Sequence, residues 1–311
     1  MQYNYTLIIS HYNRPRSLER LLDTIPQRDD MQVIVVDDSS TEGLDELRSL
    51  QAKYPHCEWY ATDSNGGGGK ARNTGLRHAR GRWLLFADSD DCYTADFDGI
   101  LEEYKDKDKD YDIVYFDAIV VTADGKVNPD ASRVPRVIRE SAEGIPIRFR
   151  LTQTWNKLFA RRIVESNHIE FEESLVSNDV YFSTLCDYYA SNTRIDRRAF
   201  YVYWVHQASV AHNKSVRKAL IKHEVMCRRH AFLVGHGFGA VDEYDFIGKN
   251  LRYIFLNGDK NDRKAACEIA RKCGAGSWLC RKYYCRFKTE ALKNSRFVMQ
   301  IKRVVRCIIR H

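Results

Sequence analysis

Apolar and polar positions alternate along the first hundred residues in a pattern that predicts strands separated by helices. Continuous apolar runs predict four strands, at residues 6–9, 32–36, 58–61 and 83–86. Apolar residues at helical spacing predict helices in the connections, at residues 18–25, at 44–50 and from about residue 70. This order predicts an α/β fold with a mostly parallel, doubly wound sheet and flanking helices.

Local signals place the starts of two of these helices. Ser39 followed by Glu42 resembles a capping box in front of the second helix. The glycine run at Gly66–Gly69 interrupts the chain, so the third helix is expected to begin at Lys70 or Ala71.

The pattern is looser after residue 91. A helix is expected at residues 97–104 and a strand at residues 112–121. Residues 127–146 contain three of the six prolines and predict an irregular connection, of the kind that often forms a lid or substrate loop. From about residue 213 the periodicity is helical. The chain is therefore divided into two halves of one α/β domain, residues 1–100 and 101–212, and a basic helical extension, residues 213–311.

Polar residues follow each of the four predicted strands. In order along the chain they are Ser10, Asp37 with Asp38, Asn65 beside the glycine run, and Asp88, Asp90 and Asp91. Ligands of open α/β sheets bind at the carboxyl ends of the strands. We therefore expect these residues to line one wall of a binding site.

The stretch after the fourth strand places three carboxylates within four positions. Carboxylates this close repel one another unless a cation lies among them. Hard oxygen ligands on a short loop suit Mg²⁺ or Mn²⁺, bound through one or two carboxylates and the phosphates of a substrate. A solvated acidic turn is the alternative interpretation.

The glycine run does not match a known phosphate-binding fingerprint. Ala71 stands where a P-loop requires Ser or Thr, and Ser64 stands where it requires Gly. A dinucleotide fingerprint would follow the first strand, where this chain has Ser10–Asn13. A glycine run before a helix can still receive a phosphate on its exposed amides, aided here by Arg72.

The composition is that of a soluble globular protein, with 44% hydrophobic and 29% charged residues. The nine cysteines are irregularly spaced and include no CxxC pair, which favours a reduced cytosolic protein. No signal peptide is visible at the N-terminus, and no apolar stretch is long enough to predict a spanning helix.

Six segments in order resemble the motifs of family 2 glycosyltransferases with the GT-A fold. They are TLIISHYNR, VIVVDDSS, NGGGGKARNTGL, LLFADSDD, WNKLFARR and SNDVYFSTL, and they lie between residues 5 and 205. The resemblance implies a GT-A fold, which is Rossmann-like, with a C-terminal helical extension. It also implies an inverting transfer of a sugar from a nucleotide sugar, usually a UDP-sugar, to an acceptor hydroxyl.

The resemblance also implies roles for residues on the donor side. Ser10 matches a position beside the nucleotide, and Asn65 belongs to the same nucleotide-sugar-binding set. Asp38, with Asp37 as its neighbour, matches the carboxylate that reads the uracil edge. Arg72 matches a contact to the base or phosphate. Asp88 matches the ribose-binding acid.

The metal is implied to be Mn²⁺ or Mg²⁺, with Asp90 as its ligand and Asp91 as a supporting or alternative ligand. Asp179 matches the general base, although Asn178 stands where the family usually has Glu. Taken from the residues alone, a cap at the start of a helix is the favoured interpretation of Asp179.

A second departure from the family follows Tyr203. Many relatives carry Arg or Lys there to reach the diphosphate, and this chain has Trp204–Ser209 instead. His206 and His212 are weaker candidates for contacting the metal or the diphosphate, and a structural role is the alternative for each.

The basic charge is concentrated at the end of the chain. Residues 277–311 carry ten Lys or Arg and one Glu, which leaves a net charge of −2 on the rest. An apolar face with basic residues beside it predicts an interfacial helix on an anionic membrane, and hence a cytoplasmic protein peripheral on the inner face of the cytoplasmic membrane. Packing on the body or on a partner is the alternative. No recognition motif accompanies the charge, so no nucleic-acid partner is expected.

The leading hypothesis is a metal-dependent, inverting glycosyltransferase that builds a surface polysaccharide or glycolipid on a glycan or lipid-linked acceptor. One alternative is a nucleotidyltransferase, which also joins a nucleotide to an α/β sheet and a divalent metal. The other is a catalytically silent binding or scaffold protein with the GT-A fold, which the Asn178 departure favours.

Overall fold

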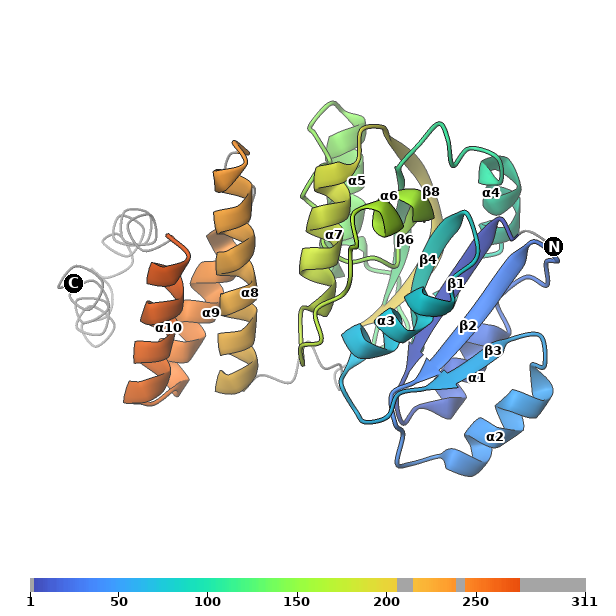
Figure 1. The fold of residues 1–311 in the computed structure, drawn as a ribbon, viewed down its shortest axis with the longest axis horizontal. Helices are drawn as coiled ribbons and strands as arrows, with labels where there is room; N and C mark the ends of the chain where they lie inside the picture. Colours follow the sequence, from blue (N-terminus) through green and yellow to red (C-terminus); the bar gives the residue numbers. More distant parts are fainter. Residues whose placement is uncertain (1–2, 206–214, 239–243, 275–311) are drawn as a thin grey trace. The chain divides into compact units, whose positions relative to one another are not determined.

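The computed structural model describes residues 3–205, 215–238 and 244–274, and the chain forms two compact units, residues 1–209 and 210–311. The elements of the first unit are, in chain order, β1 (Tyr5–His11), α1 (Pro15–Leu22), β2 (Met31–Asp37), α2 (Leu44–Lys53), β3 (Glu58–Ala61), α3 (Gly68–His78), β4 (Trp83–Asp88), β5 (Cys92–Tyr93), α4 (Phe97–Tyr104), β6 (Ile113–Thr122), η1 (Pro129–Ala131), α5 (Arg133–Ala142), β7 (Lys157–Ala160), α6 (Arg161–Ser166), α7 (Asn178–Tyr189) and β8 (Thr193–Val205) (Figure 1).

The strands of the first unit form one eight-stranded mixed sheet in the order β3-β2-β1-β4-β7-β6-β8-β5. Strands β3, β2, β1 and β4 are parallel, as the alternating pattern predicts. Strand β7 then runs antiparallel to both β4 and β6, while β6 and β8 are parallel to each other. The predicted α/β fold with a flanked sheet is confirmed.

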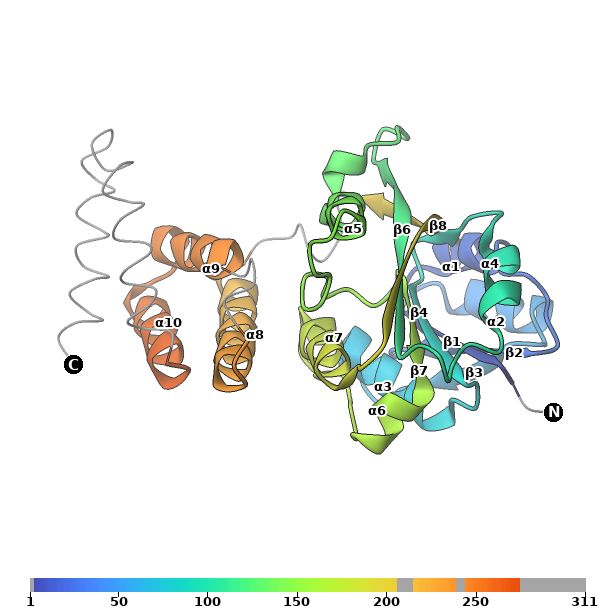
Figure 2. The ribbon, with the colours of Figure 1, turned by 90° about the horizontal axis from the view of Figure 1, so that it is seen from above.

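Helices cover both faces of this sheet. Figure 2 shows α3, α6 and α7 on one face and α1, α2 and α4 on the other. The face that carries α3 is packed closely: a Cβ atom on Gly75 would lie 2.4 Å from a methyl carbon of Ile8, so only glycine fits there. The buried core therefore spans both faces of β1 and β4, and it holds their carboxyl ends in fixed positions.

Three local expectations are wrong. Helix α3 begins at Gly68, two residues before the expected start. Ser39 does not cap α2: its hydroxyl donates to the Thr62 carbonyl (2.8 Å), and Gly43, with a φ of 67°, precedes the helix.

The third correction concerns residues 127–146, which contain η1 and α5 rather than an irregular loop. Ser132 caps α5 by accepting a hydrogen bond from the Val134 amide (3.3 Å). Pro135 lies in the first turn, where no helical hydrogen bond is lost. The prolines therefore did not indicate an irregular connection, because a proline in the first turn is compatible with a helix.

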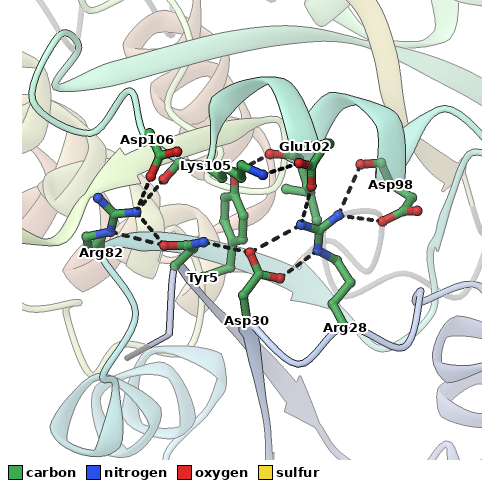
Figure 3. Close-up of polar contacts among 10 residues, drawn as sticks. Tyr5, Arg28, Asp30, Arg82, Asp98, Glu102, Lys105 and Asp106 are labelled. Atoms are coloured by element: carbon green, nitrogen blue, oxygen red, sulfur yellow. Dashed lines mark hydrogen bonds and ion pairs between the residues drawn. The ribbon is translucent and has the colours of Figure 1, made fainter. Parts of the chain in front are cut away.

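A network of charged side chains, here called the amino-end network, ties the amino ends of β1, β2 and β4 to α4 and the loop after it. Its members are Arg28, Asp30, Arg82, Asp98, Glu102, Lys105 and Asp106 (Figure 3). Arg28 lies within 3.0 Å of three carboxylates. Tyr5 lies beside it and donates from its hydroxyl to the Leu101 carbonyl (2.5 Å). Together these contacts hold α4 against the amino edge of the sheet.

The second unit contains helices α8 (Val216–Gly235), α9 (Tyr244–Asn257) and α10 (Lys260–Lys272). Ala219, Ile254 and Ala266 form a small core among them. His223 is buried, and one ring nitrogen lies 3.0 Å from the Ala266 carbonyl. None of the helices in the described part of the chain is both long and apolar enough to cross a membrane.

Candidate active site

The carboxyl ends of β1, β2 and β4 bring the predicted donor-side residues together at one edge of the sheet. Ser10 is aligned with Val36 of β2 and with Asp88 of β4, and His11 is aligned with Asp37. Asp38 follows at once, and its amide donates to the His11 carbonyl (2.8 Å). Parallel strands in register therefore place these acids at the same edge of the sheet, on the two strands that flank β1.

Asp38 organises the glycine run. Its carboxylate accepts hydrogen bonds from the Gly66 amide (3.1 Å), the Gly67 amide (2.6 Å) and the Thr62 hydroxyl (2.9 Å), and only 3% of the residue is exposed. The Asn65 side chain donates to the Asp38 carbonyl (3.1 Å). These bonds give Asp38 a loop-organising role. Two of them are accepted by Oδ1 and one by Oδ2, and a carboxylate has about four acceptor sites, so the expected contact with a uracil edge stays a prediction.

Asp37 has a similar local task in the turn after β2. Its carboxylate accepts hydrogen bonds from the Ser40 amide (3.0 Å) and the Ser40 hydroxyl (2.5 Å). The neighbouring His11 is 2% exposed, and neither ring nitrogen has a hydrogen-bond partner among the described residues. Burial lowers the pKa of His11 to about 4, although the nearby Asp37 carboxylate acts in the opposite direction. His11 is therefore neutral at pH 7.

Arg72 links the end of β4 to the start of α7. One guanidinium nitrogen donates to the Asp88 carboxylate (2.5 Å), and another donates to the Asn178 side-chain oxygen (2.8 Å). The guanidinium also lies over the Phe171 ring at 5.4 Å. Helix α3 lies close to the loop before α7, and this close approach depends on Gly69. A Cβ atom on that residue would lie 2.1 Å from the Glu172 carbonyl oxygen.

Asp179 is the second residue of α7, and it is half-buried. It does not cap the helix, because Ser177 occupies the cap position. Burial raises the pKa of Asp179, the Arg72 guanidinium partly offsets this, and the Asp88 carboxylate adds to it. The candidate base and the Arg72–Asp88 pair therefore lie close enough to interact electrostatically.

The remaining two acids after β4 differ sharply. Asp90 is partly exposed, and its carboxylate pairs with Arg14 at 2.8 Å. Asp91 is 1% exposed and accepts hydrogen bonds from the Tyr201 hydroxyl (2.9 Å) and the Trp204 amide (2.8 Å). Burial, together with the charges of Asp88 and Asp90, raises the pKa of Asp91 well above its usual range. This environment gives Asp91 a structural role and does not support its assignment as a metal ligand.

The donor set fits a hard divalent cation with few protein ligands. Asp88 and Asp90 are partly exposed carboxylates two positions apart. Within the described residues, no cluster of three or more His, Cys, Asp or Glu could hold a metal ion. A Mg²⁺ or Mn²⁺ ion at this edge would therefore use one or two carboxylates and draw its other ligands from substrate and water. The weaker candidates His206 and His212 lie outside the described residues.

The sequence shows which family this arrangement belongs to. Residues 6–165, just over half of the chain, match the family described as Glycosyl transferase family 2. The chain belongs to glycosyl transferase family 2.

Two similar proteins come from bacteria. The succinoglycan biosynthesis protein ExoO of Rhizobium meliloti is 26% identical over 66% of this chain and 62% of its own length. The poly(ribitol-phosphate) beta-N-acetylglucosaminyltransferase TarS of Staphylococcus aureus is 27% identical over 60% of this chain and 33% of its own length. The chain thus spans about three fifths of ExoO and one third of TarS.

Solved structures show that this family 2 chain has the GT-A fold. TarS residues 1–349 of S. aureus, in complex with UDP-GlcNAc, superpose with a TM-score of 0.68 at 16% identity, covering 97% of this chain and 90% of TarS 1–349. The mannosyltransferase PcManGT of Pyrobaculum calidifontis, in complex with GDP-Man and Mn²⁺, gives a TM-score of 0.55 at 18% identity, covering 99% of this chain and 86% of PcManGT.

Sequence reasoning missed the arginines that hold the acidic loop of this family 2 chain. Arg14 pairs with the Asp90 side chain, and Arg20 donates to the Asp90 carbonyl (2.5 Å) while lying 4.8 Å from the centre of the Trp204 ring. Both come from α1 and the residue before it, some 70 positions away from the loop. Arg14 ends the segment TLIISHYNR, which was the one available signal.

An aromatic stack beside the acids was also missed. Trp155 stacks on Tyr201 at 5.0 Å and on Tyr203 at 5.1 Å between ring centres. Burial, followed by the charges of Asp91 and Asp88, raises the pKa of Tyr203 to about 12. The stack therefore lies within the electrostatic field of the acidic loop.

Proposed function

We propose that this chain is an inverting, metal-dependent glycosyltransferase that moves a sugar from a UDP-sugar to an acceptor hydroxyl. The observation that carries the proposal is the position of Asp179. Its pKa is raised by burial, and the Arg72–Asp88 pair acts on it electrostatically. Asp179 directly follows Asn178, which accepts a hydrogen bond from Arg72, so the candidate base lies close to the donor-side residues that the resemblance implies. A single-displacement transfer needs a base near the donor site.

Asp179 acts as the general base in this proposal. The acceptor oxygen forms a bond to the anomeric carbon as the bond from that carbon to the diphosphate oxygen breaks. The proton of the acceptor hydroxyl passes to the Asp179 carboxylate. Because the pKa of Asp179 is raised, its carboxylate is a stronger base than that of an exposed aspartate. Activity should therefore rise with pH through a pKa above the usual aspartate range.

Arg72 and the glycine run prepare the donor side. Arg72 presents a guanidinium next to Asp88, where the negative charge of a diphosphate is stabilised by pairing. Asp38 acts through the run by binding the Gly66 and Gly67 amides. Ser10 and Asn65 remain predicted contacts of the nucleotide at the same edge.

Asp90, with Asp88 beside it, would hold the cation, Mn²⁺ or Mg²⁺. When bound, such a cation acts as a Lewis acid that stabilises the charge on the departing diphosphate. The mannosyltransferase PcManGT has a similar fold and was solved in complex with GDP-Man and Mn²⁺, which supports a test with manganese. The protein's own contribution is to keep the backbone of Asp90 at the sheet edge, through Arg20, which donates to the Asp90 carbonyl.

The names of the relatives support a role in surface polysaccharide synthesis. ExoO is a succinoglycan biosynthesis protein, and TarS is an N-acetylglucosaminyltransferase acting on poly(ribitol-phosphate). A glycan or lipid-linked acceptor is therefore proposed for this chain, and UDP-GlcNAc is the first donor to test, with UDP-glucose, UDP-galactose and UDP-GalNAc beside it.

One assay distinguishes this proposal from its alternatives. UDP release from each donor is measured with Mn²⁺, with and without acceptor. An acceptor-stimulated release of UDP supports glycosyl transfer. Release of pyrophosphate from a nucleoside triphosphate would instead indicate nucleotidyl transfer. Nucleotide binding without any turnover would indicate a silent binding protein.

The basic tail at residues 277–311 lies outside the described residues, and its membrane role is part of the proposal. Nine net positive charges beside an apolar face favour an anionic surface, at about 1 kcal/mol for each basic residue near it. The proposed location is the cytoplasmic face of the cytoplasmic membrane. A truncated chain that ends at Gly276 should no longer pellet with anionic vesicles. Equal pelleting of the truncated and full-length chains would contradict the proposed membrane role.

A further inference from the structure

Asp90 is held at two points by two different arginines. Arg20 binds the backbone carbonyl and lies over the Trp204 ring, so it supports the course of the loop. Arg14 binds the side-chain carboxylate, at 2.8 Å. Only the second contact involves the oxygens that a cation would use.

The backbone that carries Arg14 is anchored on both sides. Asn13 has a φ of 53°, and its side-chain oxygen accepts hydrogen bonds from the Thr41 and Glu42 amides (2.8 and 3.1 Å). Pro15 follows, buried, in the first turn of α1. The Arg14 side chain remains about one third exposed. Arg14 can therefore exchange its partner by a side-chain rotation, without moving the loop.

We infer that Arg14 competes with a divalent cation for the Asp90 carboxylate, and thereby keeps cation affinity low until a nucleotide diphosphate is present. The inference rests on the proposed function, because it takes Asp90 as the ligand. A guanidinium beside a carboxylate supplies the positive charge that the cation would supply, and it repels a cation that approaches. A diphosphate offers the guanidinium an alternative bidentate partner. Arg14 is thus a positioning residue that exchanges partners when donor and cation bind together.

The test measures cation binding directly. The full-length protein is titrated with Mn²⁺ alone, and the unbound ion is followed by electron paramagnetic resonance. Arg14→Ala should lower the Kd for Mn²⁺ by about three- to tenfold, a range discounted for the partial exposure of the pair. With saturating UDP the difference should shrink to less than about twofold, because UDP already draws Arg14 away from Asp90 in the native protein.

Matched variants keep the outcomes distinct. Arg16→Ala removes an exposed arginine of α1, two positions after Arg14, and should leave the Kd for Mn²⁺ unchanged. Arg14→Gln serves as a second variant with a polar, uncharged side chain, and circular dichroism checks that each variant is folded.

Asp90→Ala distinguishes a failure of the inference about Arg14 from a failure of the proposed function. If this variant binds Mn²⁺ as well as the native protein does, the proposed ligand itself is wrong. If it loses Mn²⁺ while both Arg14 variants bind Mn²⁺ equally well or more weakly, Asp90 is the ligand and the competition is overturned. A merely structural role for Arg14 would weaken binding on its removal, the opposite of the expected change.

Discussion

The two edges of the sheet use similar charged residues in different ways. At the amino edge, Arg28 contacts three carboxylates, and the amino-end network joins strands to α4 (Figure 3). At the carboxyl edge, Arg14 and Arg72 each pair with one carboxylate, Asp90 and Asp88. The first arrangement has several acids to each arginine, and the second has one.

This difference separates a structural use of charge from a functional one. Losing one partner of Arg28 leaves two others, so the amino-end network keeps its geometry without a ligand. A single guanidinium–carboxylate pair at a strand end can be exchanged for a cation on one side and a phosphate on the other. Substitutions at the carboxyl edge should therefore change activity, and substitutions at the amino edge should change stability.

The largest effect is expected at the proposed base. Asp179→Asn keeps the shape of the side chain and removes its basicity, so turnover should fall by roughly 10²–10⁴. The affinity for UDP should hardly change, because the residue is proposed to face the acceptor. Asp98→Asn, in the amino-end network, is the control and should retain full turnover. An active Asp179→Asn variant with weakened UDP binding would place Asp179 on the donor side.

The next effect is expected at the proposed metal ligand. Asp90→Ala removes a ligand oxygen and should lower activity by about a hundredfold or more, comparable to losing one electrostatic stabiliser of a transition state. Chelation of the native protein with EDTA should have the same effect, and added Mn²⁺ or Mg²⁺ should reverse it. Full turnover in EDTA would rule out a metal-dependent mechanism.

Some strands of the sheet could be predicted from the sequence and others could not. Strands β1, β2 and β4 were predicted because their apolar runs identify strands buried on both faces, whereas β3 is a partly exposed strand at the edge of the sheet. Strand β7 was missed because it begins with Lys157, which is fully buried and donates to the Leu151 carbonyl (2.7 Å). Strand β8 carries Asp196 next to two arginines, where a bulge interrupts its pairing with β6. Charged residues inside a strand conceal it from a pattern that looks for continuous apolar runs.

Some residues of the candidate site could also be predicted from the sequence, and some of their contacts could not. Ser10, Asp88 and Asp179 could be proposed in advance because each ends a strand or begins a helix within a recognisable segment. The contacts of Arg72 could not, since Asn178 lies 106 positions away. The burial of Asp91 depends on Tyr201, which is 110 positions away. Residue types were thus readable from the sequence, whereas the pairs that determine their charge state required the fold.

At the amino edge the expected effect is on stability. Arg28→Ala leaves Asp30, Asp98 and Glu102 without their shared cation and should lower the free energy of unfolding by about 2–3 kcal/mol. Turnover at low temperature should be unchanged. Arg48→Ala breaks an exposed pair with Asp45 and should cost less than about 0.5 kcal/mol. Urea unfolding measures both variants, and equal stability would show that the amino-end network is dispensable.

The smallest effect concerns His11, which lies at the carboxyl edge and is buried without a partner among the described residues. Its pKa is about 4 in the folded protein and 6.5 in an ordinary environment. Between these values the unfolded chain binds the proton and the folded chain does not, so stability falls as pH falls. From pH 7 to pH 5 this contribution is about 2 kcal/mol.

His11→Leu should remove this part of the pH dependence, and its effect can be separated from that of the other buried groups. Asp91 and Asp179 have raised pKa values, so their contributions change with the opposite sign, and stability falls as pH rises through their titrations. Only the difference between the variant and the native protein isolates His11. Urea unfolding measures how much stability each protein loses between pH 7 and pH 5. His11→Leu should lose less than the native protein, by up to about 2 kcal/mol, and the exposed His56→Asn variant should lose as much as the native protein. Equal losses in all three proteins would mean that His11 accepts a proton in the folded state at pH 5, and that the carboxyl edge tolerates a further cation beside Arg14, Arg20 and Arg72.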